Sequence, residues 1–202
     1  MIKLGVLLSG SGSNLQAIID AIAAGNLDAS VALVVSSRPD AYGLKRAQAA
    51  GIPTVALSRE VYNNQAAADE LIANELNRAN VNYVVMAGYM RKVTAPILNM
   101  FPNRVINIHP ALLPSFAGAH GISDAWEYGV KVTGVTIHLA NAEYDKGPII
   151  AQEPVIILED DTTETLEERI HAVEHELYPK VLQWFANDKV HLNEKTGKID
   201  IL

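Results

Sequence analysis

The chain has 202 residues, 49% hydrophobic and 19% charged, which suffices for one well-buried core and is short for two. It contains no cysteine, so disulfides, thiolate metal sites and cysteine nucleophiles are excluded. The net charge of -7 comes without any basic stripe, which argues against nucleic acid as a partner. No apolar run reaches the length of a membrane span, and the chain starts without the features of a signal peptide, so we expect a single cytoplasmic domain over residues 1–202.

Apolar runs alternate with helical patterns along the chain. Strands are expected at 3–8, 31–36, 54–57, 83–87, 105–109, 134–139 and 149–155. Helices are expected at about 15–22, 44–50, 66–78 and 163–186, with Pro179 kinking or splitting the last, and a hairpin is expected over 189–202. This alternation predicts an α/β fold with a doubly wound, mainly parallel, Rossmann-like seven-stranded sheet, whose ligands bind beyond the C-terminal ends of the strands.

The loop SGSGSN, from Ser9 to Asn14, connects the first strand to the first helix. Leu15 stands where a dinucleotide fingerprint needs its third glycine, and the loop has no P-loop lysine, so NAD binding and nucleoside triphosphate hydrolysis are disfavoured. Two interpretations stay open: a helix N-cap made by Ser13 or Asn14, and a cradle of backbone amides for a phosphate monoester. The loop alone favours the cap.

A polar pair ends the strand expected at 105–109. Asn107 and His109 are two residues apart and therefore share one face, near the strand end where ligands of parallel sheets bind. An amide donor beside an imidazole can stabilise an oxyanion and move a proton. Asp145 follows a strand that carries His138, and an acid near His109 would raise its pKa and fix its tautomer. Each of these residues taken singly is more typical of a structural role, whereas together they indicate catalysis.

Five segments carry a resemblance to a known family: SGSGSNLQ, AGYMRKV, NIHPALLPSF, VTIHLANAEYDKGPII and EHELYP. Over essentially its whole length the chain resembles the phosphoribosylglycinamide formyltransferases, and EHELYP sets it apart from other folate formyltransferases. The resemblance implies a formyltransferase fold, with phosphate binding in residues 1–100 or so and catalysis and folate contacts in about 101–202. It implies that the formyl group of 10-formyltetrahydrofolate, a co-substrate, passes to the amine of glycinamide ribonucleotide in purine (IMP) biosynthesis, without a metal.

The resemblance also implies roles for individual residues. His109 would be the proton donor, Asp145 would raise its pKa, and Asn107 would bridge the two substrates. The ribonucleotide would be held by Gly12, Ser13, Asn14 and Glu174. The folate would lie against Met90, Arg91, Lys92, Val93 and Asn107, and His138 and His120 would support the site. Asn64 stands nearest to the position where many members have an arginine that contacts the folate, and it lacks the charge of that arginine.

Two other classes of protein stay open at this point. Methionyl-tRNA formyltransferase and formyltetrahydrofolate deformylase share the strand-end residues, but each adds a domain for which 202 residues leave no room. A non-catalytic Rossmann-like sensor of a phosphorylated metabolite would fit the remaining features, yet it would not need Asn107, His109 and Asp145 together. We therefore expect a transferase with small-molecule substrates, no nucleic-acid or membrane partner, and a monomeric or homodimeric state.

Overall fold

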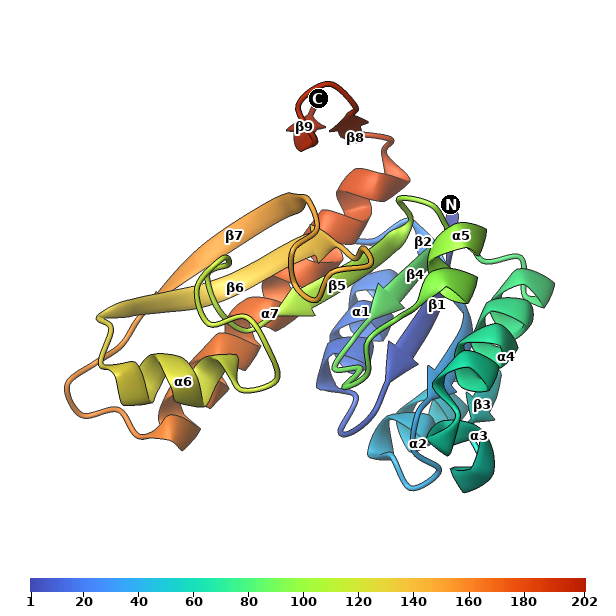
Figure 1. Cartoon of the computed structure of the whole chain (residues 1–202), viewed down its shortest axis with the longest axis horizontal. Helices are drawn as coiled ribbons and strands as arrows, with labels where there is room; N and C mark the ends of the chain where they lie inside the picture. Colours follow the sequence, from blue (N-terminus) through green and yellow to red (C-terminus); the bar gives the residue numbers. More distant parts are fainter.

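The computed structural model describes residues 1–202, and a seven-stranded sheet forms its centre (Figure 1). The strands are β1 (Ile2–Leu8), β2 (Ala29–Ser36), β3 (Thr54–Ala56), β4 (Tyr83–Met86), β5 (Val105–His109), β6 (Val132–Leu139) and β7 (Ile149–Ile156). Their order is β3-β2-β1-β4-β5-β6-β7; β1 to β5 run parallel, whereas β6 and β7 pair antiparallel. The predicted mainly parallel sheet of seven strands is confirmed.

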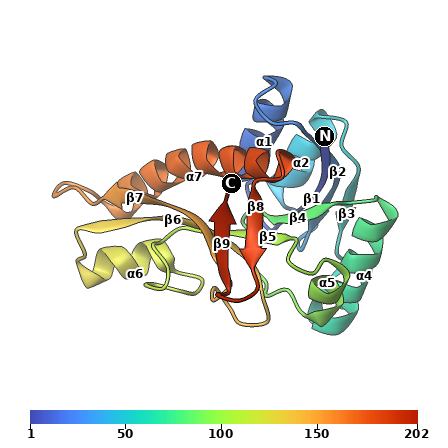
Figure 2. The ribbon, with the colours of Figure 1, turned by 90° about the horizontal axis from the view of Figure 1, so that it is seen from above.

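Helices cover both faces of this sheet, as Figure 2 shows from above. They are α1 (Ser13–Ala23), α2 (Tyr42–Ala49), α3 (Arg59–Asn63), α4 (Gln65–Arg78), α5 (Ala95–Met100), α6 (Gly121–Tyr128) and α7 (Thr163–Ala186). One hydrophobic core joins α1, α2 and α7 to the sheet, and a second joins α4 and α5 to its other face. Along β1, Val6 and Leu8 enter the first core and Leu7 enters the second, because successive side chains of a strand point to opposite faces. The sheet is therefore doubly wound, as predicted.

Two features differ from the sequence-based expectation. Helices α3, α5 and α6 were not predicted. With 5 and 6 residues, α3 and α5 contain too few turns to show a helical period. The predicted split at Pro179 is wrong: α7 continues through this residue. Proline removes one intrahelical hydrogen bond, but Pro179 and its neighbours Tyr178, Val181 and Leu182 are buried, and this packing holds the helix together.

The C-terminal hairpin is confirmed as β8 (Val190–Asn193) paired with β9 (Lys198–Ile201). None of the helices is both long and apolar enough to cross a membrane.

The chain order reverses between β1 and β4, which is the point where open α/β sheets form a ligand crevice. Two loops meet there, one after β1 and one after β4. The buried hydroxyl of Tyr178, from α7, lies 3.1 Å from the Met86 carbonyl oxygen and 3.0 Å from that of Ile106, and so ties α7 to β4 and β5. These contacts hold the strand ends that carry the site.

Candidate active site

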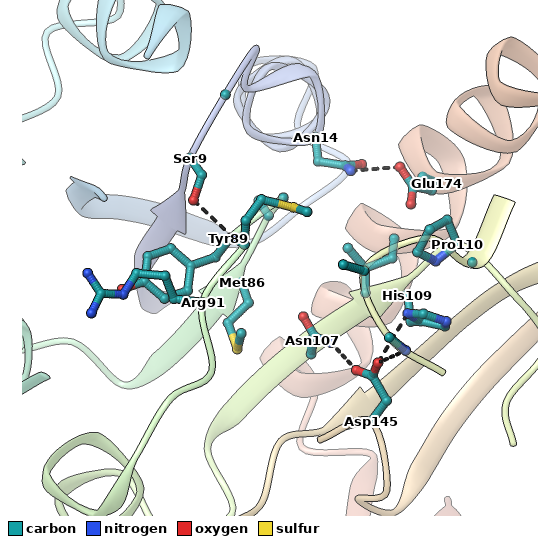
Figure 3. Close-up of a pocket in the computed structure, with 18 of the residues that line it drawn as sticks. Ser9, Asn14, Met86, Tyr89, Arg91, Asn107, His109, Pro110, Asp145 and Glu174 are labelled. Atoms are coloured by element: carbon teal, nitrogen blue, oxygen red, sulfur yellow. Dashed lines mark hydrogen bonds and ion pairs between the residues drawn. The ribbon is translucent and has the colours of Figure 1, made fainter. Parts of the chain in front are cut away.

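A cleft of about 650 Å³ lies at the C-terminal ends of β1, β4 and β5 (Figure 3). Its walls come from the loop after β1, the segment after β4, the end of β5, the start of α6, the β6–β7 loop and the first half of α7. The predicted site residues that line it are Gly12, Ser13, Asn14, Met90, Arg91, Lys92, Val93, Asn107, His109, His120, His138, Asp145 and Glu174. Of the predicted set, only Asn64 lies outside the cleft lining.

The loop after β1 presents backbone amides to the cleft. Gly12 has a φ of 70°, and a Cβ at this position would lie 2.6 Å from the Gly43 Cα, so both the backbone conformation and the close packing require glycine. The amides of Gly12, Ser13 and Asn14 donate to no backbone carbonyl, as is usual in the first turn of a helix. No side chain caps α1, so the N-cap interpretation of Ser13 or Asn14 is wrong. The amides therefore remain free to donate to a ligand.

Asn14 turns its side chain away from this amide cradle. Its Nδ2 donates to Oε2 of Glu174 at 2.9 Å, and both side chains are buried. Burial raises the pKa of Glu174, and the hydrogen bond from Asn14 partly offsets that rise. Asn14 can therefore serve a phosphate through its backbone only, while its side chain fixes the Glu174 carboxyl at the cleft wall.

Three long-range side-chain contacts hold the two loops in place. The Ser9 hydroxyl accepts from Ser37 at 2.7 Å and from the Met90 amide at 3.0 Å, which joins the loop after β1 to the segment after β4. Arg46 donates from Nε to the Ser11 carbonyl at 2.9 Å and places a cation beside the amide cradle. The sequence does not show these contacts, because the residues that they join are 28, 81 and 35 positions apart in the chain.

The segment from Met90 to Val93 forms another wall of the cleft. Its Arg91, Lys92 and Val93 amides donate no hydrogen bond within the protein, whereas the Lys92 carbonyl accepts from Gln65 at 3.0 Å. The Met90 side chain is 62% exposed. This wall therefore combines free amide donors with an exposed thioether, which suits a flat heteroaromatic ligand.

The prediction for Asn64 is not supported. Its side chain accepts from the Ala67 amide at 3.2 Å and so caps α4, which satisfies the helix terminus instead of a ligand. The cation in this region is Arg91, whose guanidinium lies 4.2 Å from the centre of the Tyr62 ring and donates to the Tyr62 carbonyl and to Gln65.

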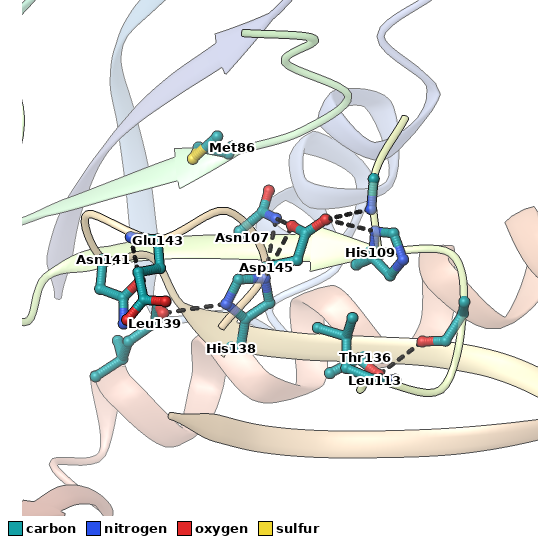
Figure 4. A network of polar contacts seen from close by, with 12 residues as sticks. Met86, Asn107, His109, Leu113, Thr136, His138, Leu139, Asn141, Glu143 and Asp145 are labelled. Carbon is teal, nitrogen blue, oxygen red and sulfur yellow. Dashed lines mark hydrogen bonds and ion pairs between the residues drawn. The ribbon is translucent and has the colours of Figure 1, made fainter. Parts of the chain in front are cut away.

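Asp145 is the centre of the polar network in Figure 4. One carboxylate oxygen, Oδ2, accepts from the Gly118 amide at 2.9 Å and lies 3.5 Å from Nδ1 of His109. The other, Oδ1, lies 3.4 Å from Nδ2 of Asn107 and 3.6 Å from Nε2 of His138. Burial raises the pKa of Asp145, but the contacts with His138, Gly118 and His109 outweigh it and lower the pKa overall. Asp145 is thus a buried carboxylate that stays charged.

His109 is 3% exposed and has both ring nitrogens opposite acceptors. Its Nε2 lies 2.8 Å from the Phe116 carbonyl oxygen and its Nδ1 faces Asp145. Gly121 permits this ring position, since a Cβ there would lie 3.1 Å from Nε2. Burial lowers the pKa of His109 more than Asp145 and the Phe116 carbonyl raise it. The predicted direction is right for the contribution of Asp145 and wrong for the net pKa, because the sequence did not show how deeply the ring is buried.

His138 and His120 occupy different positions relative to this network. His138, on β6, lies 3.0 Å from Nδ2 of Asn107 and belongs to the network. His120 precedes α6, is exposed and lines the cleft without a side-chain hydrogen bond. The structure therefore brings Asn107, His109, His138 and Asp145 together and leaves His120 at the rim.

A comparison of the sequence with protein-family models gives one match, to the formyl transferase model, over residues 2–182. The chain belongs to the formyl transferase family. The match includes every residue of the polar network and both loops of the cleft.

Known proteins resemble the chain along most of its length. The chain is 43% identical over 183 residues to a phosphoribosylglycinamide formyltransferase of Bacillus subtilis. This match covers 91% of this chain and 94% of the relative. The chain is 42% identical over 195 residues to the trifunctional purine biosynthetic protein adenosine-3 of Chironomus tentans, of which the match spans 14%. The crystal structure of glycinamide ribonucleotide transformylase 1 from Symbiobacterium toebii superposes with a TM-score of 0.96 at 46% identity, over 100% of this chain and 94% of that one.

Proposed function

We propose that this formyl transferase family member transfers the formyl group of 10-formyltetrahydrofolate to the amine of glycinamide ribonucleotide in purine (IMP) biosynthesis. The products are formylglycinamide ribonucleotide and tetrahydrofolate. The observation that carries the proposal is the convergence of Asn107, His109 and Asp145 in one cleft between an amide cradle and a wall with free amides. Relatives that are similar along nearly the whole chain are named for this reaction.

The ribonucleotide would bind at the α1 end of the cleft. Its phosphate monoester would accept from the amides of Gly12, Ser13 and Asn14, where the helix N-terminus carries a partial positive charge. The Glu174 carboxyl, held by the Asn14 side chain, would accept from ribose hydroxyls. Arg46 adds a cation behind the cradle, which matters in a chain with a net charge of -7.

The folate would bind against the segment from Met90 to Val93. Free amides of Arg91, Lys92 and Val93 can donate to the pterin ring, and the exposed Met90 side chain can pack on its face. Asn64 is not part of this proposal, since it caps α4. With these positions the formyl carbon would lie near Asn107, at the end of β5 between the two binding regions.

The transfer needs three things: stabilisation of a negative oxygen, removal of a proton from the attacking nitrogen, and protonation of the leaving nitrogen. The neutral amine attacks the formyl carbon, which forms a C–N bond and leaves a negative oxygen and a positive nitrogen. An N–H of Asn107 and the protonated ring of His109 would stabilise the oxygen, and one such donor is typically worth about 3 kcal/mol. Asp145, directly or through water, would accept the proton from the new ammonium nitrogen. Breakage of the bond between the carbon and the folate nitrogen then returns the carbonyl, and His109 protonates the leaving nitrogen.

The contacts of the His109 ring support one choice for the proton that it would give. Its Nε2 is held by the Phe116 carbonyl at 2.8 Å, whereas Nδ1 faces Asp145 at the cleft. The proton on Nδ1 is therefore the one available to the folate nitrogen. Asp145 favours the imidazolium that carries it, against the lowering effect of burial on the pKa of His109.

The cleft draws on both halves of the chain. We propose one domain over residues 1–202, in which residues up to about 100 supply the phosphate cradle and the folate wall and the rest supply the reacting groups. The acidic composition fits small-molecule substrates without a nucleic-acid or membrane partner. We further propose a cytoplasmic enzyme that is a monomer or homodimer and takes 10-formyltetrahydrofolate as co-substrate without a metal.

The test is an assay that mixes purified protein with glycinamide ribonucleotide and 10-formyltetrahydrofolate and follows the loss of the formyl donor. A control omits the ribonucleotide. Loss of the donor only in the full mixture supports the transferase. Equal loss in the control would identify a hydrolase of the formyl donor, and no loss in either would refute the proposal.

A further inference from the structure

The hydrogen bonds around His138 have defined directions. The side chain is 1% exposed on β6, and its Nδ1 lies 3.0 Å from the carbonyl oxygen of Leu139. A carbonyl oxygen can only accept, so Nδ1 must carry a proton. In the neutral ring Nε2 is then the nitrogen with the lone pair, and it accepts.

This lone pair determines how the Asn107 amide lies. Nδ2 of Asn107 is 3.0 Å from Nε2 of His138 and 3.4 Å from Oδ1 of Asp145, so both neighbours hold the amino end. The carbonyl oxygen of Asn107 accepts no hydrogen bond from the protein and points to the side of the cleft where Met86 lies (Figure 4). The end of the amide that is open to the cleft is therefore an acceptor.

An acceptor has the wrong polarity for a developing oxyanion, which needs a donor. A proton on Nε2 of His138 would reverse the arrangement. Nε2 would then donate, and Oδ1 of Asp145 lies 3.6 Å from it. The amino group of Asn107 would then face another donor, and two donors cannot form a hydrogen bond. A half-turn of the amide would instead let its oxygen accept from Nε2 of His138 and would place its N–H groups in the cleft.

We propose that His138 is a positioning residue whose protonation decides which end of the Asn107 amide faces the cleft. The imidazolium form presents the N–H to the oxyanion, and the neutral form presents the carbonyl oxygen. The role in turnover rests on the proposed formyl transfer, whereas the coupling of the amide to the ring does not.

Two other titratable groups face His138. Asp145, on the β6–β7 loop, has Oδ1 3.6 Å from Nε2 of His138, and His109, on β5, faces the other oxygen of the same carboxylate. Glu143, on the same loop as Asp145, is exposed and paired with Lys146 at 2.9 Å. Two histidine rings thus lie beside one carboxylate.

The first test reads the tautomer without substrates. Long-range proton–nitrogen correlation spectra of the full chain, recorded across pH and assigned with the His138→Asn variant, report which ring nitrogen carries the proton. We expect a neutral form with Nδ1–H and a side-chain amide signal of Asn107 that shifts together with the titration of His138. A neutral form with Nε2–H, or an Asn107 signal indifferent to that titration, would overturn the proposal.

The second test is a double-mutant cycle on turnover. His138→Asn should lower kcat by about 10²-fold, the effect of one lost oxyanion donor, and leave the KM for the ribonucleotide unchanged. In an Asn107→Ala background the same substitution should change kcat by less than about two-fold, because the group through which His138 acts is gone. Equal losses in both backgrounds would mean that His138 acts otherwise, for example by supporting Asp145.

His191→Asn is the control for a histidine loss outside the site, since His191 lies in the β8–β9 hairpin. If the parent protein shows no formyl transfer at all, the proposed function fails and the spectra still decide the coupling.

Discussion

Replacing Asp145 by asparagine removes a buried negative charge from the site with little change of shape. Asp145 has a φ of 53°, in the left-handed region that asparagine tolerates, so the loop backbone is not strained by the substitution. An amide oxygen can still accept from the Gly118 amide, which lies 2.9 Å from the carboxylate. The change therefore removes the charge and keeps this contact, while the amide nitrogen takes the place of Oδ1 opposite Nδ2 of Asn107.

The size of the effect follows from the distance between Asp145 and His109. Opposite charges about 4 Å apart attract by about 4 kcal/mol at an effective dielectric constant of about 20. Oδ2 of Asp145 lies 3.5 Å from Nδ1 of His109, and both side chains are 4% exposed, so solvent screens the pair little. Because 1.36 kcal/mol corresponds to a factor of ten in rate, loss of the pair should lower turnover by about 10³-fold.

Steady-state kinetics of formyl transfer would measure kcat and the KM for the ribonucleotide across pH. We expect kcat to fall by this factor while the KM changes little, because the amide cradle is untouched. The pKa of His109 should fall further without the carboxylate, so the loss of activity on raising the pH should begin at a lower pH. Unchanged turnover in Asp145→Asn would refute the role assigned to the charge.

Asp161→Asn is the matched control. Asp161 has the same low exposure and pairs with Arg169, but it lies outside the cleft. This variant should keep its turnover, even if its thermal stability falls.

Three further substitutions test the structural basis of the site. Gly12→Ala should lower the free energy of unfolding by about 1–3 kcal/mol, because the positive φ and the 2.6 Å approach of a Cβ to the Gly43 Cα would both cause strain. Urea denaturation would measure this loss, and stability equal to the parent would show that the loop can relax. In the parent, burial raises the pKa of Glu174 in the folded state above that in the unfolded chain. As the pH rises from the ordinary glutamate range, the unfolded chain therefore loses this proton before the folded protein does, and the free energy of unfolding falls. Glu174→Gln should abolish that fall in urea denaturation at several pH values, and it should raise the KM for the ribonucleotide. Tyr178→Phe should cost about 1–3 kcal/mol of unfolding free energy, because the buried carbonyls of Met86 and Ile106 lose their donor, and a neutral effect in the same assay would contradict this reasoning.

Much of the sheet could be predicted because parallel strands buried on both faces are apolar along their length. The strand at Val105–His109 was placed with its observed limits, and the long helix at Thr163–Ala186 likewise. The continuity of that helix through Pro179 could not be predicted, since it depends on packing against residues far away in the chain. The side chain of Asn64 was interpreted without knowing where the next helix begins, and in the structure it caps α4 through the Ala67 amide three residues along the chain.

The sequence by itself determined the components of the site: glycines at a strand-to-helix turn, a polar pair in register at the end of an apolar strand, and an aspartate in a loop about 36 residues further on. Local chemistry was enough for this, because strand alternation and turn geometry are properties of short segments. Only the tertiary structure decided how those components act. The burial of His109, the turn of Asn14 to Glu174 and the direction of the Asn107 amide toward His138 all depend on groups brought together by long-range packing. Burial and hydrogen-bond partners set the protonation and orientation of these side chains, and neither can be read from residues that are neighbours in the chain.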